Sequence, residues 1–217
     1  MTIEQIAEPL VFASHPRFVE EPYPPGLVAV LCAETGVPFK DFVASYRRLQ
    51  VPTGSGECFL ANGEKVQSRN LAVEALLANS QCEWLWFMDN DHVFPQDYLL
   101  NQLKVFEAEQ FDVLGSLYLS RLAPPETYPI GGLFTRSPDK LYLTVRNLAW
   151  ADLPGFVTVL ERPDLCLGTA GLLIRRRVFG QLSEPYFQVG QIRKDKEHED
   201  LYFSIRCQER GLKVGLD

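Results

Sequence analysis

The sequence predicts an α/β protein with a mostly parallel central sheet, flanking helices and a small antiparallel insertion. Short apolar runs alternate along the chain with longer stretches in which apolar residues recur every three or four positions. This alternation is typical of a layered domain with a largely parallel sheet. Between residues 123 and 163 the alternation stops and prolines and glycines accumulate, which predicts the insertion.

Length and charge set further limits. The chain has 217 residues, of which 46% are hydrophobic and 23% charged, close to ordinary globular proteins. Its 21 Lys and Arg against 28 Asp and Glu give a net charge of −7. A protein that binds duplex nucleic acid through its phosphates usually carries a basic stripe instead. The sequence therefore predicts no duplex nucleic acid partner.

The N-terminal sequence and the cysteine pattern are those of an ordinary globular protein. The first residues lack a basic stretch followed by an apolar one, and no run of about 20 apolar residues occurs. We therefore expect no secretory signal, no transmembrane segment and a cytoplasmic location. The five cysteines form no CxxC pair, which favours buried thiols over a zinc or disulfide framework.

The elements follow in order from these patterns. Residues 1–25 are rich in proline and predict an irregular N-terminal arm, with a short helix at its start, ahead of one domain over 26–217. Gly26 to Cys32 is apolar throughout, as expected of a parallel strand buried on both faces. Further apolar runs predict strands at 84–88, 112–119, 170–174 and 213–216. Shorter strand-like pieces lie within the insertion at 140–145 and 156–160.

Helices are predicted between these strands. Phe39, Phe42, Val43 and Tyr46 recur at helical spacing, and Gly211 suits the residue just beyond a helix end. The predicted helices cover 37–49, 64–79, 95–109, 177–182 and 197–210, and a glycine-rich turn covers 53–56.

The strongest chemical signal is the triplet Asp89-Asn90-Asp91, directly after the most apolar strand. Ligands of open α/β sheets bind outside the carboxyl ends of the strands. Two carboxylates there suit a hard cation such as Mg²⁺, whose other ligands come from substrate phosphates and water. A plain polar turn before the next helix is the competing interpretation.

A second acidic group, His198-Glu199-Asp200, opens the last predicted helix. Acids in a first turn also favour the helix dipole, so a structural role is the alternative. Glu199 and Asp200 point about 100° apart, so one can face a cleft as a general base while the other braces a loop.

Two weaker signals complete the set. Gly168-Thr169-Ala170-Gly171 precedes a predicted strand, where small residues allow a ligand close to the backbone or simply form a tight turn. Arg69, inside the helix over 64–79, suits either a phosphate or a structural salt bridge.

Four segments in this order resemble family-2-like glycosyltransferases of the GT-A fold, the Rossmann-like fold of nucleotide-diphospho-sugar transferases. They are QSRNLAV (67–73), WLWFMDNDHVF (84–94), CLGTAGLLIRRRVF (166–179) and HEDLYFSIRCQERGLKVGLD (198–217). They are similar to the family's aRN helix, its strand with a DxD motif, its GTGxLLIRRxVF segment and its ED helix. The resemblance covers residues 26–217.

The resemblance implies a nucleotide-sugar donor, such as a UDP- or GDP-sugar, and Mn²⁺ or Mg²⁺. Asp91 would bind the metal, Asp89 the metal or the donor, and Asp200 would be the base of an inverting transfer, with Glu199 as runner-up. The acceptor would be a glycan, lipid, protein or small molecule. The remaining expected donor-binding residues are Ala33, Glu34, Thr35, Arg69, Asn90, Gly168, Thr169 and Ala170.

One departure from the family leaves alternatives open. Members commonly place a metal-binding histidine shortly after the strand that corresponds to 213–217, and this sequence stops first. Either the domain is truncated at its C-terminus, or another residue such as His198 or His92 completes the metal site. A catalytically inactive nucleotide- or glycan-binding module is one alternative. A sugar nucleotidyltransferase is the other, although Ala33 to Gly36 lacks the expected basic glycine-rich loop.

Overall fold

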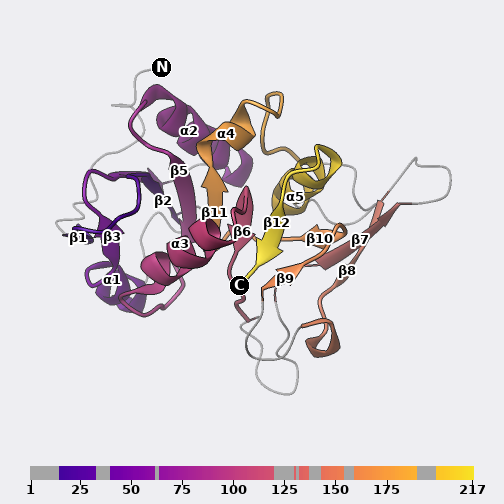
Figure 1. Ribbon diagram of the computed structural model, residues 1–217, viewed down its shortest axis with the longest axis horizontal. Coiled ribbons are helices and arrows are strands. Elements are labelled where there is room, and N and C mark those ends of the chain that lie inside the picture. The colour runs from indigo at the N-terminus through magenta and orange to yellow at the C-terminus, as the bar shows by residue number, and fades with distance from the viewer. Residues whose placement is uncertain are drawn as a thin grey trace.

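A seven-stranded sheet forms the centre of the molecule (Figure 1). The computed structural model describes residues 15–32, 40–61, 64–119, 130, 132–136, 143–153, 159–189 and 199–217. The strands lie in the order β4 (Gly56–Ala61), β2 (Leu27–Cys32), β5 (Trp84–Asp89), β11 (Leu172–Arg175), β6 (Val113–Gly115), β12 (Val214–Leu216) and β9 (Leu160–Glu161).

The strand directions confirm a mostly parallel sheet. β2 pairs in parallel with β4 and β5, and β6 pairs in parallel with β12. β11 runs antiparallel to both of its neighbours, β5 and β6, and β9 runs antiparallel to β12. The start of β11 therefore lies beside the ends of β5 and β6, and this juxtaposition builds the candidate site.

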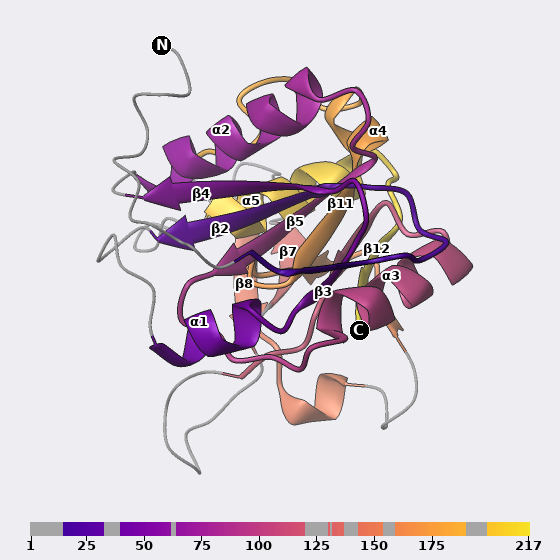
Figure 2. The same ribbon diagram turned by 90° about the vertical axis from the view of Figure 1, so that its left-hand side faces the viewer.

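Helices cover both faces of the sheet. Figure 2 shows α2 (Lys65–Ala78) and α4 (Arg176–Phe179) on one side and α1 (Lys40–Tyr46) and α3 (Tyr98–Ala108) on the other. α5 (Glu199–Glu209) packs into the core on the side of α2. None of the helices within the described ranges has the length and apolar character that a membrane span needs.

The sheet divides the core into two apolar clusters. Ala29 and Leu31 of β2 pack on the side of α2, whereas Val28 and Val30 pack on the side of α1 and α3. Because alternate residues of a strand face opposite ways, a strand covered on both sides needs apolar residues at every position. This burial explains the continuous apolar runs of the sequence.

Two smaller sheets complete the fold. β7 (Gly132–Arg136), β8 (Leu143–Asn147) and β10 (Leu165–Cys166) form an antiparallel sheet on the side of the molecule away from β2 (Figure 1). This sheet confirms the antiparallel insertion and extends it to β10. β1 (Arg17–Val19) pairs in parallel with β3 (Gln50–Pro52), and a 3₁₀ turn covers Trp150–Asp152.

The predicted elements of the central domain are present with shifted ends, but five strands of the described residues escaped prediction: β1, β3, β4, β7 and β10. β1 lies within the arm that was expected to be irregular, and β3 and β4 flank the predicted glycine-rich turn. β4 mixes Gly56 and Glu57 with apolar residues, as edge strands often do, so it lacks the apolar run that marks a central strand. The helix expected at the start of the arm lies outside the described residues.

A buried glutamine ties α3 to three neighbouring strands. The Nε2 of Gln102 donates to the carbonyl oxygens of Leu114 (3.0 Å) and Gly171 (2.7 Å), and its Oε1 accepts from Trp86 Nε1 at 2.8 Å. Trp86 lies on β5, Leu114 on β6 and Gly171 directly before β11. Gln102 thus satisfies three buried polar groups that have no access to water.

We expect Gln102→Leu to destabilise the protein by about 3 kcal/mol, because the partner groups of Gln102 would stay buried without hydrogen bonds. Urea unfolding measures the change. The matched control is Gln181→Leu, at an exposed position. Equal unfolding midpoints for the two variants would contradict the role given to Gln102.

Candidate active site at the carboxyl edge of the sheet

The ends of β5 and β6 and the start of β11 meet at one edge of the sheet. Asp89 is the last residue of β5, and the Asn90 amide that follows donates to the Leu31 carbonyl of β2 at 3.1 Å. The Gly171 amide donates to the Phe87 carbonyl at 2.8 Å. These bonds hold the acidic triplet and the glycine turn side by side.

The triplet is partly buried and supported by its neighbours. Asn90 is buried, whereas Asp89 and Asp91 are half-buried. Asp91 Oδ1 lies 2.8 Å from His92 Nδ1. Burial lowers the pKa of His92, although the charge of Asp89 and a backbone hydrogen bond act against it. The imidazole is thus mostly uncharged at neutral pH and lies in close contact with one oxygen of Asp91.

A buried thiol also borders the triplet. Burial raises the pKa of Cys32 to about 11; a hydrogen bond with Asn90 lowers it and the charge of Asp89 raises it. Cys32 therefore stays protonated at neutral pH and is a packing residue rather than a nucleophile.

Tyr118 follows β6 at the same edge of the sheet and was missed by sequence reasoning. Its ring packs edge-on against His92, with ring centroids 4.9 Å apart. Burial raises the pKa of its hydroxyl, and the carboxylates of Asp89 and Asp200 raise it further. A hydrogen bond with the Ala170 backbone and the charge of Arg69 act in the opposite direction. The charges of both Asp89 and Asp200 thus disfavour ionisation of the same hydroxyl.

The glycine turn closes directly against this tyrosine. A Cβ at Gly168 would overlap the Tyr118 hydroxyl, and one at Gly171 would lie 2.5 Å from the Tyr98 hydroxyl oxygen. Gly171 also has φ +70°, which favours glycine. Thr169 and Ala170 are buried, so the turn presents mainly its backbone to the site.

Glu199 and Asp200 have different surroundings at the start of α5. Arg69 Nε and Nη2 each lie 3.0 Å from Glu199 Oε1, and both residues are buried. Asp200 is half-buried, and its Oδ1 accepts from the Leu201 amide at 2.8 Å. The sequence predicts that one of these two acids has a bracing role while the other faces a cleft. Glu199 is the acid with the bracing role, because it pairs with Arg69.

One nitrogen of the Arg69 side chain, Nη1, stays without a partner among the described residues. The guanidinium lies 5.8 Å from the centre of the Phe87 ring, and Nη1 makes no hydrogen bond with any described residue. Nε and Nη2 serve Glu199, so Nη1 is the nitrogen that remains for a ligand.

Within the described ranges, no group of three or more His, Cys, Asp or Glu side chains is arranged to hold a metal ion. Asp89 and Asp91 nevertheless fit a hard divalent cation, because such ions accept one or two protein carboxylates and complete their shell with phosphate oxygens and water. Ala33, Glu34, Thr35 and His198 lie outside the described residues.

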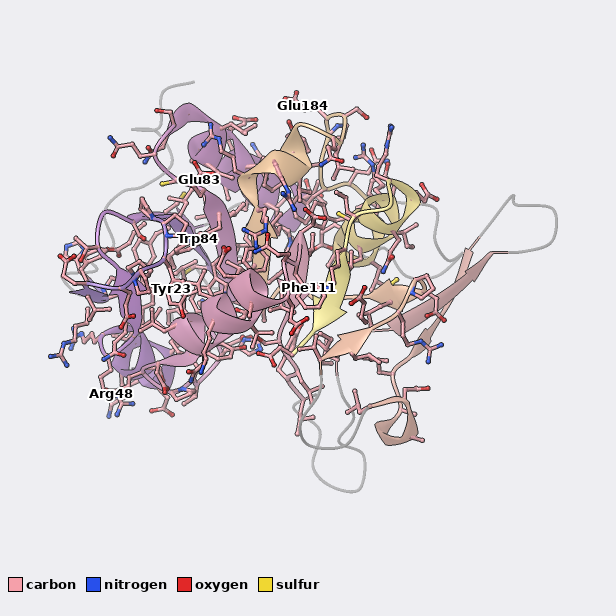
Figure 3. The ribbon with its side chains drawn as sticks, viewed as in Figure 1. Tyr23, Arg48, Glu83, Trp84, Phe111 and Glu184 are labelled. Carbon is pink, nitrogen blue, oxygen red and sulfur yellow. The ribbon has the colours of Figure 1, made fainter. Side chains whose placement is uncertain are left out.

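A hollow of about 210 Å³ lies near the opposite end of β5, lined by Pro24, Glu83, Trp84, Glu107, Arg175 and Arg177. Figure 3 shows Glu83 and Trp84, and the nearby Trp84 Nε1 donates to the Pro24 carbonyl at 2.8 Å. Arg175 is bound to Glu107 and to the carbonyls of Phe106 and Phe111. These groups satisfy one another, so the hollow offers no comparable chemistry.

We expect Arg69→Leu to destabilise the protein by about 3 to 5 kcal/mol, because Glu199 would remain charged and buried without its partner. The double variant Arg69→Leu, Glu199→Leu should recover most of that loss. Chemical denaturation measures both.

The control for this prediction is Arg162→Leu. Arg162 pairs with Asp164 near the surface, with side-chain exposures of 39% and 33%, so its loss should cost less than about 1 kcal/mol. A similar small cost for Arg69→Leu would show that the buried pair is unimportant.

Comparison with known proteins adds the family. The model of glycosyl transferase family 2 matches residues 57–164, which include Arg69, the acidic triplet and Tyr118. None of the curated proteins matches the chain.

Two solved structures are similar. The protein A197 from STIV has a TM-score of 0.52 and 16% identity, over 89% of this chain and 81% of its own. The inositol-1-phosphate CTP transferase from T. maritima has a TM-score of 0.45 and 12% identity, over 89% and 85%. The likeness to A197 shows the fold alone, and the second score is too low to support an argument. The family match and the fold together establish that this chain carries a glycosyl transferase family 2 domain, on a mixed α/β fold consistent with GT-A.

Proposed function

We propose that this protein is a glycosyltransferase that moves a sugar from a nucleotide-diphosphate donor, such as a UDP- or GDP-sugar, to an acceptor hydroxyl. One observation carries the proposal beyond the family: the glycine segment is hydrogen-bonded to both β5 and α5. The Gly171 amide donates to the Phe87 carbonyl at 2.8 Å and the Leu167 amide donates to Ser204 Oγ at 3.0 Å, which brings the end of β5 with Asp89 and the start of α5 with Asp200 to the same turn. A transfer of this kind needs one protein group that binds the donor diphosphate and another that removes the acceptor proton, on opposite sides of the sugar.

The donor side is assigned to the acidic triplet. Asp89 and Asp91 would hold Mn²⁺ or Mg²⁺ against the diphosphate, and the bound cation would neutralise charge on the leaving group. The bond from the Asn90 amide to the Leu31 carbonyl supports this assignment, because it fixes the backbone between the two carboxylates at the end of β5. Ala33, Glu34 and Thr35 remain predicted neighbours of the nucleotide base. Arg69 remains a predicted contact of the nucleotide sugar, through its Nη1.

The acceptor side is assigned to Asp200 and the turn at Gly168 to Ala170. Asp200 takes the proton of the acceptor hydroxyl. At the same time the acceptor oxygen attacks the anomeric carbon and the bond from that carbon to the diphosphate breaks, so the configuration at this carbon is inverted. Glu199 is the weaker candidate, since its carboxylate already neutralises Arg69. The identity of the acceptor stays open among glycans, lipids, proteins and small molecules.

We expect one nucleoside diphosphate, among UDP, GDP, CDP and dTDP, to raise the unfolding temperature only when Mn²⁺ is present. At about 100 times its dissociation constant the ligand adds roughly 2.7 kcal/mol, or about 5 to 10 °C for a chain of this size.

Asp91→Asn should abolish that shift. Asp97→Asn serves as the charge-matched control, because Asp97 is exposed and makes no capping hydrogen bond at the start of α3. No shift with any nucleotide in the unmodified protein would contradict the proposed donor site.

We expect Asp200→Asn to lower kcat by about 10²- to 10⁴-fold, the usual contribution of a general base, while the nucleotide-dependent thermal shift stays intact. Steady-state kinetics with the responding nucleotide sugar, with water or an added acceptor, measures this. Near-normal turnover would refute the assignment of Asp200. Nucleotide binding without turnover in the unmodified protein would instead favour a binding module.

A further inference from the structure

We propose that Tyr118 contacts the sugar of the donor, with its hydroxyl donating a hydrogen bond to a sugar hydroxyl beside the glycine turn, at the edge shared by the end of β5 and the start of α5. This inference rests on the proposed function and deepens it, since neither the family match nor the predicted site residues assign a group to the sugar itself.

The backbone around Tyr118 is held on both sides. The Leu117 amide donates to the Asp217 carbonyl at 2.7 Å, and the Ile130 amide donates to the Tyr118 carbonyl at 2.9 Å. Leu117 and Leu119 are exposed at 39% and 46%, whereas the Tyr118 hydroxyl is buried. Alternate residues of an extended segment face opposite ways, so Tyr118 is the residue of this segment that points into the site.

The side chain is held as firmly as the backbone. His92 packs against the ring at 4.9 Å between centroids, and the glycine turn meets the hydroxyl at Gly168 and Ala170. Tyr118 therefore joins the loop that carries Asp91 to the turn that precedes β11. A hydroxyl held this way is positioned before any ligand binds, which keeps the entropic cost of its hydrogen bond low.

The chemistry of the hydroxyl suits a sugar. A tyrosine hydroxyl has an ordinary pKa of about 10 and keeps its proton at neutral pH, and burial of the Tyr118 hydroxyl favours the neutral form further. The hydrogen bond from Ala170 occupies an acceptor position of the oxygen and leaves the proton for another partner. Sugar hydroxyls accept such bonds, and a neutral donor adds no charge at this edge.

A purely structural role for Tyr118 makes a different prediction. If the hydroxyl only supports the glycine turn, its loss should weaken binding of a nucleoside diphosphate and of its sugar conjugate alike. If the hydroxyl contacts the sugar, its loss should weaken binding of the conjugate alone. The ratio of the two dissociation constants separates these cases without any knowledge of the acceptor.

The test is calorimetric titration of the full chain with UDP, GDP, CDP and dTDP, and with the glucose conjugate of each, in Mn²⁺. For the nucleotide that binds, Tyr118→Phe should raise the dissociation constant of the conjugate by about 5- to 30-fold, the effect of one lost hydrogen bond to a desolvated group. The dissociation constant of the bare nucleotide should change by less than about twofold.

Tyr98→Phe is the matched control. Its hydroxyl is also buried, and it bonds to Ser116 at the same edge, but its ring belongs to the cluster on the α3 side. This variant should leave the dissociation constants of both ligands unchanged.

Gly168→Ala probes the same contact from the other side. The added Cβ would overlap the Tyr118 hydroxyl, so this variant should reproduce the selective loss. The double variant with Tyr118→Phe should lose less than the product of the separate losses, since both changes act on one contact.

The possible outcomes are distinct. Equal weakening of nucleotide and conjugate in Tyr118→Phe, or no weakening, would overturn the sugar contact and leave the proposed function standing. Failure of the unmodified protein to bind any nucleotide or conjugate would overturn both.

Discussion

The arrangement of the site depends on the buried ion pair between Arg69 and Glu199. These residues lie 130 positions apart, on α2 and at the start of α5, and both are almost fully buried. A buried ion pair adds little net stability, because desolvation of both charges offsets their attraction, but removal of one partner leaves a costly charge. The pair therefore acts mainly as a geometric lock. It fixes the first turn of α5 against α2, and it engages Glu199 rather than Asp200, whose charge instead raises the pKa of the Tyr118 hydroxyl.

The antiparallel strand β11 provides the other half of the arrangement. In a fully parallel sheet the segment before β11 would lie at the opposite edge from the end of β5. Because β11 runs the other way between β5 and β6, the turn from Gly168 to Gly171 comes to the edge that carries Asp89. Gln102 joins α3 to all three strands at this point. The arrangement of the site thus depends on the direction of β11 as much as on side-chain contacts.

The sequence predicts the parts of this site that depend on local pattern. The run before Asp89 is apolar because both faces of β5 are covered, so its sudden end is visible in the sequence. Tyr118 follows a strand of only three residues, and an aromatic residue there is equally suited to a core. Its role emerges only from contacts with His92 and Gly168, which are distant in sequence. The pairing of Arg69 with Glu199 likewise depends on tertiary structure. Helical periodicity predicts which face of α2 carries Arg69, but it does not predict a partner that is distant in sequence.

The two glycines of the turn carry different constraints, with a consequence for how such a chain can diverge. Gly171 is excluded from substitution by its own backbone conformation as well as by Tyr98. Gly168 is constrained by what occupies position 118 and by Ile130, and it has no positive φ. Homologues with a smaller residue at position 118 should tolerate residues other than glycine at position 168. Position 171 should remain glycine in them. Covariation between 118 and 168, set against an invariant 171, is the evolutionary trace that this packing should leave.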